Sequence, residues 1–169
     1  MKPIIRRAVK SDIEAIYALS CKVHNASYAV LIPDDHRDEF LADFTFSDQK
    51  LRDRYDYFLP RLVDPSWYVW VAELDGHVVG YTKEVRTDSH TISKRGLFVD
   101  PDYQGRGIGT ALFETSLSIA RSGGIFHLEV IEGNKKAQDL YKKHGFKITG
   151  YAPADFYGAK MVMMELTIS

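Results

Sequence analysis

The sequence predicts an α/β protein, a single domain built on a central mixed β-sheet with helices on its faces. Three observations support this. The chain of 169 residues has the length of one domain. Three strand-like segments follow one another between Trp67 and Val99. Beyond Val99, helical and strand-like patterns alternate. The expected order over residues 1–169 is β-α-α-β-β-β-α-β-α-β-β.

The first third of the chain predicts one short strand and two helical regions. Residues 4–5 are an apolar pair typical of a strand. Ser11 to Glu14 has the S-x-x-E form of a capping box, so a helix is expected to begin there. The apolar pattern breaks near Pro33, and a second helical region follows, kinked or ended at Pro60. Its apolar residues recur at helical spacing: Leu51, Tyr55, Phe58 and Leu62.

The middle of the chain predicts three antiparallel strands. Trp67–Leu74 is rich in Val, Trp and Tyr, which favour strands. Asp75-Gly76 follows, and this dipeptide is typical of a type I′ hairpin turn because both turn residues need positive φ. His77–Arg86 is therefore the expected partner strand, and Thr91–Val99 the third.

The last third predicts the alternating part of the fold. A helix that begins at Ile108 is expected to stop at Gly123-Gly124, and another runs from about Asn134 to His144. Gly145 is a natural residue to end the second helix. The remaining strands are expected at Ile125–Ile131, Lys147–Tyr151 and Ala159–Thr167.

Composition narrows the class of partner and the cellular compartment. Lys and Arg number 22 against 23 Asp and Glu, so no basic excess favours nucleic acid as a partner. The single cysteine, Cys21, excludes an internal disulfide and is expected to be a small buried residue. No signal peptide and no run long enough to span a membrane is found, so we expect a cytoplasmic protein without a membrane partner.

Three glycines mark the junction between Val99 and the following helix. A P-loop would need a lysine after Gly109, and the dinucleotide fingerprint would need a glycine at Thr110. Neither motif is therefore complete. Glycines that precede a helix still allow backbone N–H groups to approach an anion, with help from the helix dipole. The junction predicts a phosphate site of another kind.

Two segments resemble the Gcn5-related N-acetyltransferases (the GNAT family). "VDPDYQGRGIGTAL" is similar to the acyl-CoA pyrophosphate loop of that family, V-x-P-x-x-[QR]-G-x-G-[IV]-G-x-x-L. "LEVIEGNKKAQDLYKKHGF" is similar to its strand–helix–strand unit and, in its E-x4-N-x6-Y spacing, to the ribosomal-protein alanine N-acetyltransferases. The resemblance covers roughly residues 67–166 and implies a GNAT-like fold, acetyl-CoA as co-substrate, no metal and a primary amine as acceptor.

The resemblance also implies where the cofactor lies. The pyrophosphate would meet the backbone N–H groups of Gln104, Gly105, Arg106, Gly107, Ile108, Gly109 and Thr110. The pantetheine arm would extend the sheet along the backbone of Leu97, Phe98 and Val99, as an added strand does. An N–H near Phe98 or Val99 would polarise the thioester carbonyl. Asn134, Ala137 and Tyr141 share one helix face that would line the channel, although Asn134 is equally suited to cap the helix.

Three residues are candidates for the chemistry. An alkyl amine is almost wholly protonated at neutral pH, so a base must free its lone pair. The family often uses a Glu on the fourth strand, but Thr91–Val99 contains no acid. Glu129 is the expected base and Glu84 the reserve. Tyr141 is the expected acid that protonates the departing thiolate.

The sequence is compatible with several acceptor amines and with more than one oligomeric state. Acidic residues between 25 and 61 would attract a cationic amine or polyamine, or simply form solvated helix faces. Aromatic residues that would line an acceptor pocket are Tyr28, Tyr151, Phe156 and Tyr157. A peptide N-terminus, a polyamine and a small amino compound are all compatible, and so is a homodimer. The alternative function is a non-catalytic acyl-CoA-binding domain.

Overall fold

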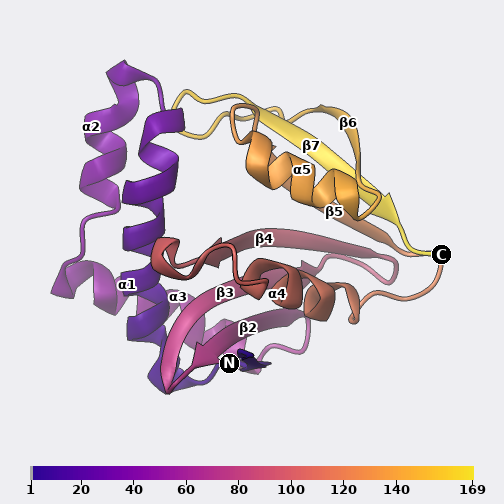
Figure 1. The fold of residues 1–169 in the computed structure, drawn as a ribbon, viewed down its shortest axis with the longest axis horizontal. Helices are drawn as coiled ribbons and strands as arrows, with labels where there is room; N and C mark the ends of the chain where they lie inside the picture. Colours follow the sequence, from indigo (N-terminus) through magenta and orange to yellow (C-terminus); the bar gives the residue numbers. More distant parts are fainter. Residues whose placement is uncertain (1) are drawn as a thin grey trace.

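A computed structural model describes residues 2–169 and confirms the mixed sheet with helices on its faces (Figure 1). Seven strands pair in the order β1-β2-β3-β4-β5-β7-β6. Their bounds are β1 Ile4–Arg7, β2 Trp67–Leu74, β3 His77–Arg86, β4 Thr91–Val99, β5 Ile125–Ile131, β6 Lys147–Tyr151 and β7 Met161–Thr167. The strands expected from sequence are all present, with β7 beginning two residues later than expected.

Neighbouring strands are antiparallel except for the central pair, β4 and β5, which is parallel. The β2–β3 hairpin turns at Asp75 and Gly76, whose φ angles are 52° and 79°. Both are positive, as a type I′ turn requires. This hairpin pairs Trp67 with Val85 and Leu74 with His77, so β2 and β3 are neighbours along their whole length.

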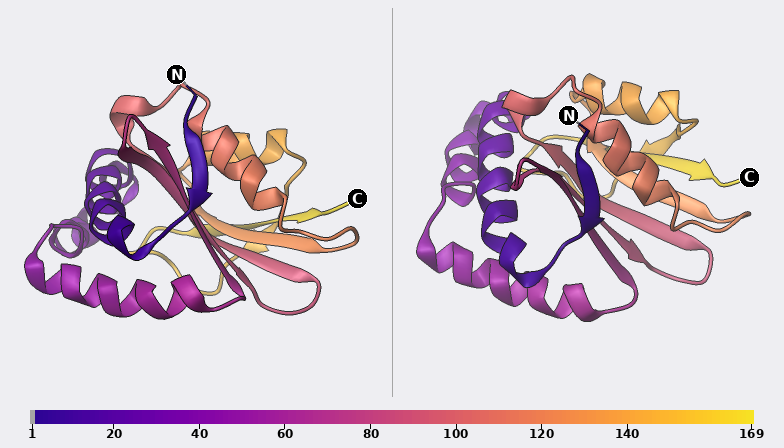
Figure 2. Two further views of the ribbon diagram at one scale, coloured as in Figure 1. Left: turned by 90° about the horizontal axis from the view of Figure 1, so that it is seen from below. Right: turned by 60° about the horizontal axis from the view of Figure 1, so that its bottom comes forward.

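Helices cover both faces of the sheet (Figure 2). On one face, α1 (Ile13–Val23) and α3 (Asp48–Val63) pack on β2 and β3. On the other, α4 (Ile108–Leu117) packs on β2, β3 and β4, and α5 (Lys135–Lys143) packs beside α4 against β5. Within residues 2–169, no helix is both long and apolar enough to cross a membrane.

The N-terminal helical region differs from the expectation. An additional helix, α2, spans Asp34–Asp43 between α1 and α3. Its sequence is mostly polar, so it carries little helical periodicity, and only Phe40 is fully buried. Pro60 does not end α3, which continues to Val63, because a proline near the last turn removes only one backbone donor.

Two helix ends also differ. The Ser11–Glu14 capping box does not form, because a short 3₁₀ turn precedes α1 and the Asp12 carboxylate accepts a hydrogen bond from the Val9 N–H at 2.8 Å. Helix α4 ends at Leu117, six residues before Gly123. Ser118, at the C-cap, donates its hydroxyl to the Thr115 carbonyl at 2.7 Å, and the Ser116 Oγ in the last turn lies 3.0 Å from the Leu112 carbonyl. Such side-chain bonds weaken a helix interior.

Strands β4 and β5 separate after a short stretch of pairing. Their pairing runs only from Thr91–Ile125 to Lys94–Leu128. At the same level β4 bulges against β3, because Thr82 pairs with Leu97 while Glu84 pairs with Lys94. Two residues of β4, Arg95 and Gly96, thus face one residue of β3, and Gly96 has a φ of +140°. The bulge bends β4 away from β5, and the two strands diverge in Figure 1.

Candidate active site between strands β4 and β5

A cavity of about 600 Å³ opens where β4 and β5 separate. Residues of β4, β5, α1, α3 and α5 line it, so it connects the two faces of the sheet. Its lining among residues 2–169 contains several cationic side chains but a single carboxylate, that of Glu129. The cavity therefore has room for an extended molecule that passes through the sheet, with one acid beside it.

The loop before α4 presents unused backbone donors. Gly105 and Gly107 both have a φ of +78°, a left-handed conformation that favours glycine. Within residues 2–169, no backbone N–H from Gly105 to Thr110 donates a hydrogen bond. The Gln104 N–H is different, because it donates to Pro101 at 3.4 Å. The cradle suited to a pyrophosphate therefore begins at Gly105 rather than Gln104.

No side chain among residues 2–169 fills this cradle. A Cβ atom at Gly105 or Gly107 would meet no atom within 4 Å, so the space above the loop is open. Glycine is favoured at these positions because of the positive φ, and not because a larger side chain would collide with a neighbour. Gly107 is the N-cap of α4 and offers no side-chain cap, which leaves the first N–H groups of the helix for an external anion. Arg106 is exposed beside the loop. The residues present thus fit a phosphate-bearing ligand.

The free edge of β4 is set by the hydrogen bonding of the sheet. The Asp100 N–H donates to Val79 on β3 at 2.9 Å. Because successive N–H groups of a strand point to opposite sides, the Phe98 N–H also points toward β3. The N–H groups of Leu97 and Val99 then point toward the gap. Of the two N–H groups considered for the thioester, those of Phe98 and Val99, only that of Val99 therefore points toward the gap.

Glu129 lies on β5 at the first position beyond the paired stretch. Its neighbours Leu128 and Val130 pack against the α4 and α5 face, so the alternation of the strand turns Glu129 to the opposite face. The Glu129 side chain is 44% exposed, and its Oε1 lies 3.8 Å from the Nε2 of His127. A carboxylate in this position is accessible to an amine that enters from the α1 side.

Tyr141 reaches the cavity from α5, on the other face of the sheet. Gly145 ends α5 as expected: its N–H donates to Lys142, and the Phe146 N–H donates to Tyr141, the pattern of a Schellman motif. This turn packs Phe146 against Tyr141, with ring centroids 5.6 Å apart. Phe113 of α4 packs on Tyr141 at the same separation.

These contacts bury Tyr141, and burial raises the pKa of its phenol well above the ordinary value. Glu129 and Tyr141, both singled out from sequence, thus line one cavity from opposite faces of the sheet.

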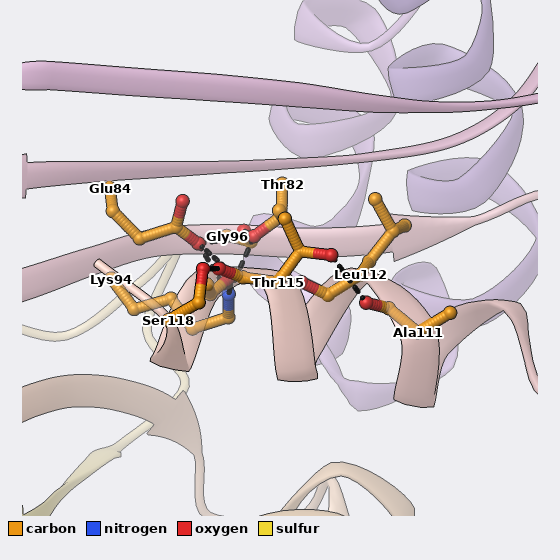
Figure 3. A network of polar contacts seen from close by, with 9 residues as sticks. Thr82, Glu84, Lys94, Gly96, Ala111, Leu112, Thr115 and Ser118 are labelled. Atoms are coloured by element: carbon orange, nitrogen blue, oxygen red, sulfur yellow. Dashed lines mark hydrogen bonds and ion pairs between the residues drawn. The ribbon is translucent and has the colours of Figure 1, made fainter. Parts of the chain in front are cut away.

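Glu84 occupies a different place from the one expected of a base. Its carboxylate is fully buried, and its Oε1 lies 2.6 Å from the Nζ of Lys94 on β4 (Figure 3). Thr82 and Ser116 donate to the same oxygen at 2.6 and 2.7 Å. Glu84 does not line the cavity. It is held as a structural partner of Lys94 at the bulge, and we leave it out of the proposed catalytic set.

Of the two roles considered for Asn134, lining the channel and capping the helix, the structure shows the helix cap. Its Oδ1 accepts a hydrogen bond from the Ala137 N–H at 3.1 Å, so Asn134 is the N-cap of the helix. Ala137 lines the cavity, as expected of a small residue on the channel face. Lys136 donates to the side chain of Gln104 at 2.6 Å and so ties α5 to the phosphate loop.

The residues that line the cavity on its α1 side differ in part from those expected to line an acceptor pocket. Tyr28 and Phe156 line it, whereas Tyr151 and Tyr157 do not. None of the acidic residues between 25 and 61 lines it. Three cationic residues that the sequence patterns did not single out do so instead: Arg54 of α3, Lys83 of β3 and Arg95 of β4. The alternation of side chains along β3 could have indicated Lys83, because neighbouring strand residues such as Lys83 and Glu84 face opposite sides of the sheet.

Comparison with known proteins supports the family suggested by these features. The Acetyltransferase (GNAT) family matches residues 33–146. The peptidyl-lysine N-acetyltransferase YjaB of Escherichia coli is 32% identical over 162 residues, which cover 96% of this chain and 94% of that protein. The N-alpha-acetyltransferase RimI of Mycobacterium tuberculosis is 38% identical over 96 residues, or 55% of this chain and 60% of that protein.

A similar fold is found in a PaiA N-acetyltransferase of Thermoplasma acidophilum solved in complex with coenzyme A, with a TM-score of 0.73, 20% identity and 99% of each chain covered. The chain matches 61% of the length of three uncharacterized mycobacterial N-acetyltransferases. With a family match over residues 33–146 and a relative aligned over nearly its whole length, the chain belongs to the GNAT family.

Proposed function

We propose that the protein transfers the acetyl group of acetyl-CoA to a primary amine by direct attack within a ternary complex. The observation that carries this proposal is the cavity between β4 and β5, which Glu129 and Tyr141 line from opposite faces of the sheet. An acyl donor held on one face and an amine held on the other would meet in that gap.

The donor would be held by main-chain groups. The N–H groups of Gly105 to Thr110 are free to bind the pyrophosphate, and those of Leu97 and Val99 would pair with the pantetheine amides as an added strand. The Val99 N–H would also donate to the thioester oxygen as negative charge develops there. These contacts depend on backbone geometry, which explains the need for positive φ at Gly105 and Gly107.

Two side chains would handle the protons. Glu129 accepts a proton from the ammonium form of the acceptor, directly or through water, so that the amine lone pair attacks the thioester carbon. The C–N bond forms, the C–S bond breaks, and the leaving thiolate takes the hydroxyl proton of Tyr141, while the proton released by the acylated nitrogen passes through solvent and restores the phenol. Because burial keeps the pKa of Tyr141 high, the phenol stays protonated and able to donate at every physiological pH.

The test separates binding from turnover. Calorimetry with acetyl-CoA should show association with the folded protein, and thiol release with a panel of primary amines should follow. Glu129→Gln should lower kcat by about 10²-fold or more, as expected for the loss of a general base, while acetyl-CoA affinity changes little. Association without thiol release from any amine would instead indicate a non-catalytic acyl-CoA-binding domain. Absence of association would overturn the assignment of the loop.

A further inference from the structure

Three cationic side chains that line the cavity, those of Lys83, Arg54 and Arg95, have no carboxylate partner among residues 2–169, whereas Lys94 pairs with Glu84. The Nζ of Lys83 lies 3.4 Å from the hydroxyl of Tyr57 and 4.9 Å from the centroid of its ring. The guanidinium of Arg54 lies 5.5 Å from the ring centroid of Tyr17.

The surroundings of these cations are mostly aromatic. Tyr28, Tyr81 and Phe98 lie together, with the Tyr81 and Phe98 ring centroids 5.0 Å apart. His24 stacks on Phe44 at 3.8 Å, and burial lowers its pKa to about 4, so His24 is neutral here. The positive charge of this part of the cavity therefore comes from the half-buried Lys83 and Arg54 and from the exposed Arg95.

The phosphates of the donor do not account for these charges. Alternate residues of β3 face opposite sides of the sheet. Glu84 and Thr82 face α4, where Ser116 bonds to Glu84, so Lys83 faces α1 and α3. The phosphate cradle lies at the N-terminus of α4, on the opposite face. A ligand group that neutralises Lys83 must therefore enter with the acceptor.

The register places Lys83, Arg95 and Glu129 in one row across the sheet, because Arg95 follows Lys94, the partner of Leu128. Lys83 faces the β4 bulge at Arg95 and Gly96, and Glu129 follows Leu128, the last residue of β5 that pairs with β4. From β3 to β5 there are two strand spacings, or about 10 Å, and the distance from Lys83 to Glu129 is larger because β4 and β5 separate here. A single small molecule can span this distance between the two side chains.

We propose that the acceptor is an amino acid-like molecule, with its amine at Glu129 and a carboxylate bound by Lys83 and Arg54. This inference rests on the proposed function and names the substrate class of the same site. A half-buried cation without a partner loses hydration, and a bound carboxylate compensates for that loss through charge-assisted hydrogen bonds. Burial lowers the pKa of Lys83, as expected for a cation whose partner arrives only with a ligand.

Binding of an aromatic carboxylate tests the anion site without any chemistry. Calorimetry in the presence of coenzyme A would compare phenylacetate with phenylacetamide, its uncharged counterpart. Phenylacetate should bind at least about tenfold more tightly, because hydrogen bonds to charged groups are worth that much or more. Lys83→Met or Arg54→Met should remove the difference. Lys10→Met, at an exposed lysine outside the cavity, is the matched control and should keep it.

Equal binding of phenylacetate and phenylacetamide, or no binding of phenylacetate, would overturn the proposal. Inorganic phosphate is a separate arm of the same experiment. If phosphate binds in a Lys83-dependent way and phenylacetate does not bind, the site is built for a phosphate, and the assignment of a carboxylate is overturned.

Turnover then separates this inference from the proposed function. L-Phenylalanine would be compared with phenethylamine, and 6-aminohexanoate with hexylamine, in a thiol-release assay. At least one carboxylate-bearing amine should exceed its partner about tenfold or more in kcat/KM, and Lys83→Met should bring the ratio close to one. Equal use of both members of each pair would refute the carboxylate site while leaving acetyl transfer intact. No thiol release from any amine, with phenylacetate still bound, would refute the transfer and leave the anion site.

Discussion

Two lysines on neighbouring strands of the same sheet have opposite surroundings. Lys94 on β4 is buried against the α4 face and is surrounded by Glu84, Thr82 and Ser116 at hydrogen-bond distances. Lys83 on β3 faces α1 and α3, and a tyrosine hydroxyl and two aromatic rings are its neighbours. A cation whose charge the chain itself neutralises serves the fold. A cation left without a partner in a cavity is available to a ligand.

The largest expected effect concerns the stability of these two sites. Lys94→Met leaves Glu84 buried without a counter-charge and should lower the free energy of unfolding by about 3–5 kcal/mol. Lys83→Met removes no ion pair and should change it by no more than about 0.5 kcal/mol or raise it. Urea unfolding measures both. Glu84→Gln added to Lys94→Met should recover part of the loss, and equal losses from the two lysine variants would break the comparison.

The next effect concerns the donor face. Tyr141→Phe removes one hydroxyl and leaves the ring packed on Phe113 and Phe146, so the fold should be kept. We expect kcat to fall by about 10²-fold, the lower end of the contribution of a general acid. The affinity for acetyl-CoA, measured by calorimetry, should stay within about twofold. A parallel loss of kcat and affinity would assign Tyr141 to cofactor binding alone.

A smaller effect concerns the phosphate cradle. Gly107→Val introduces a side chain at a φ of +78° and should weaken coenzyme A binding about tenfold, because the left-handed backbone costs about 1–2 kcal/mol for such a residue. Gly123→Val is the matched control, since Gly123 has a φ of +77°, has equally open space and lies away from the loop. Both variants should lose similar stability. Unchanged coenzyme A affinity in Gly107→Val would refute the cradle.

The smallest expected effect concerns the ion pair of Arg6 and Asp12 at the β1 edge of the sheet, where the chain again neutralises its own charges. Burial raises the pKa of Asp12, but hydrogen bonds from Arg6 at 2.7 Å and from the Val9 N–H lower it more, so the pKa is below its ordinary value. A depressed carboxyl pKa stabilises the fold above about pH 4, and this contribution is lost as the pH falls through the folded-state value. Asp12→Asn should therefore flatten the decline of unfolding free energy below pH 4 by about 1 kcal/mol, because charge-assisted hydrogen bonds contribute energies of this order. Acid titration of stability by circular dichroism would measure this, and an unaltered slope would contradict it.

Local signals in the sequence were sufficient for most of the fold. Asp75-Gly76 predicted the hairpin because the turn type depends on those two residues alone. Gly145 predicted the end of α5 for the same reason. Helix α2 was missed because its polar sequence lacks an apolar stripe, and the helix depends on the burial of Phe40 among Ile32, Ile131 and Ala159. Those contacts join parts of the chain that no local pattern connects.

The site divides in the same way. Short motifs indicated the glycine loop, Glu129 and Tyr141, because each motif lies within one strand–helix junction or one helix. The role of Glu84 was not predictable, since its partner Lys94 lies on another strand and Ser116 on a helix beyond the glycine loop. Lys83 and Arg54 were not singled out, because they come from separate elements and share a cavity only after α3 packs on β3.

The sequence by itself determined the order of strands and helices, the hairpin and the glycine conformation of the loop, because these depend on a few adjacent residues and their allowed backbone angles. Only the tertiary structure decided which charges are neutralised and which are left for a ligand. Whether a lysine finds a carboxylate depends on strand register, on the β4 bulge and on which face a side chain takes, and these are fixed by packing between distant segments.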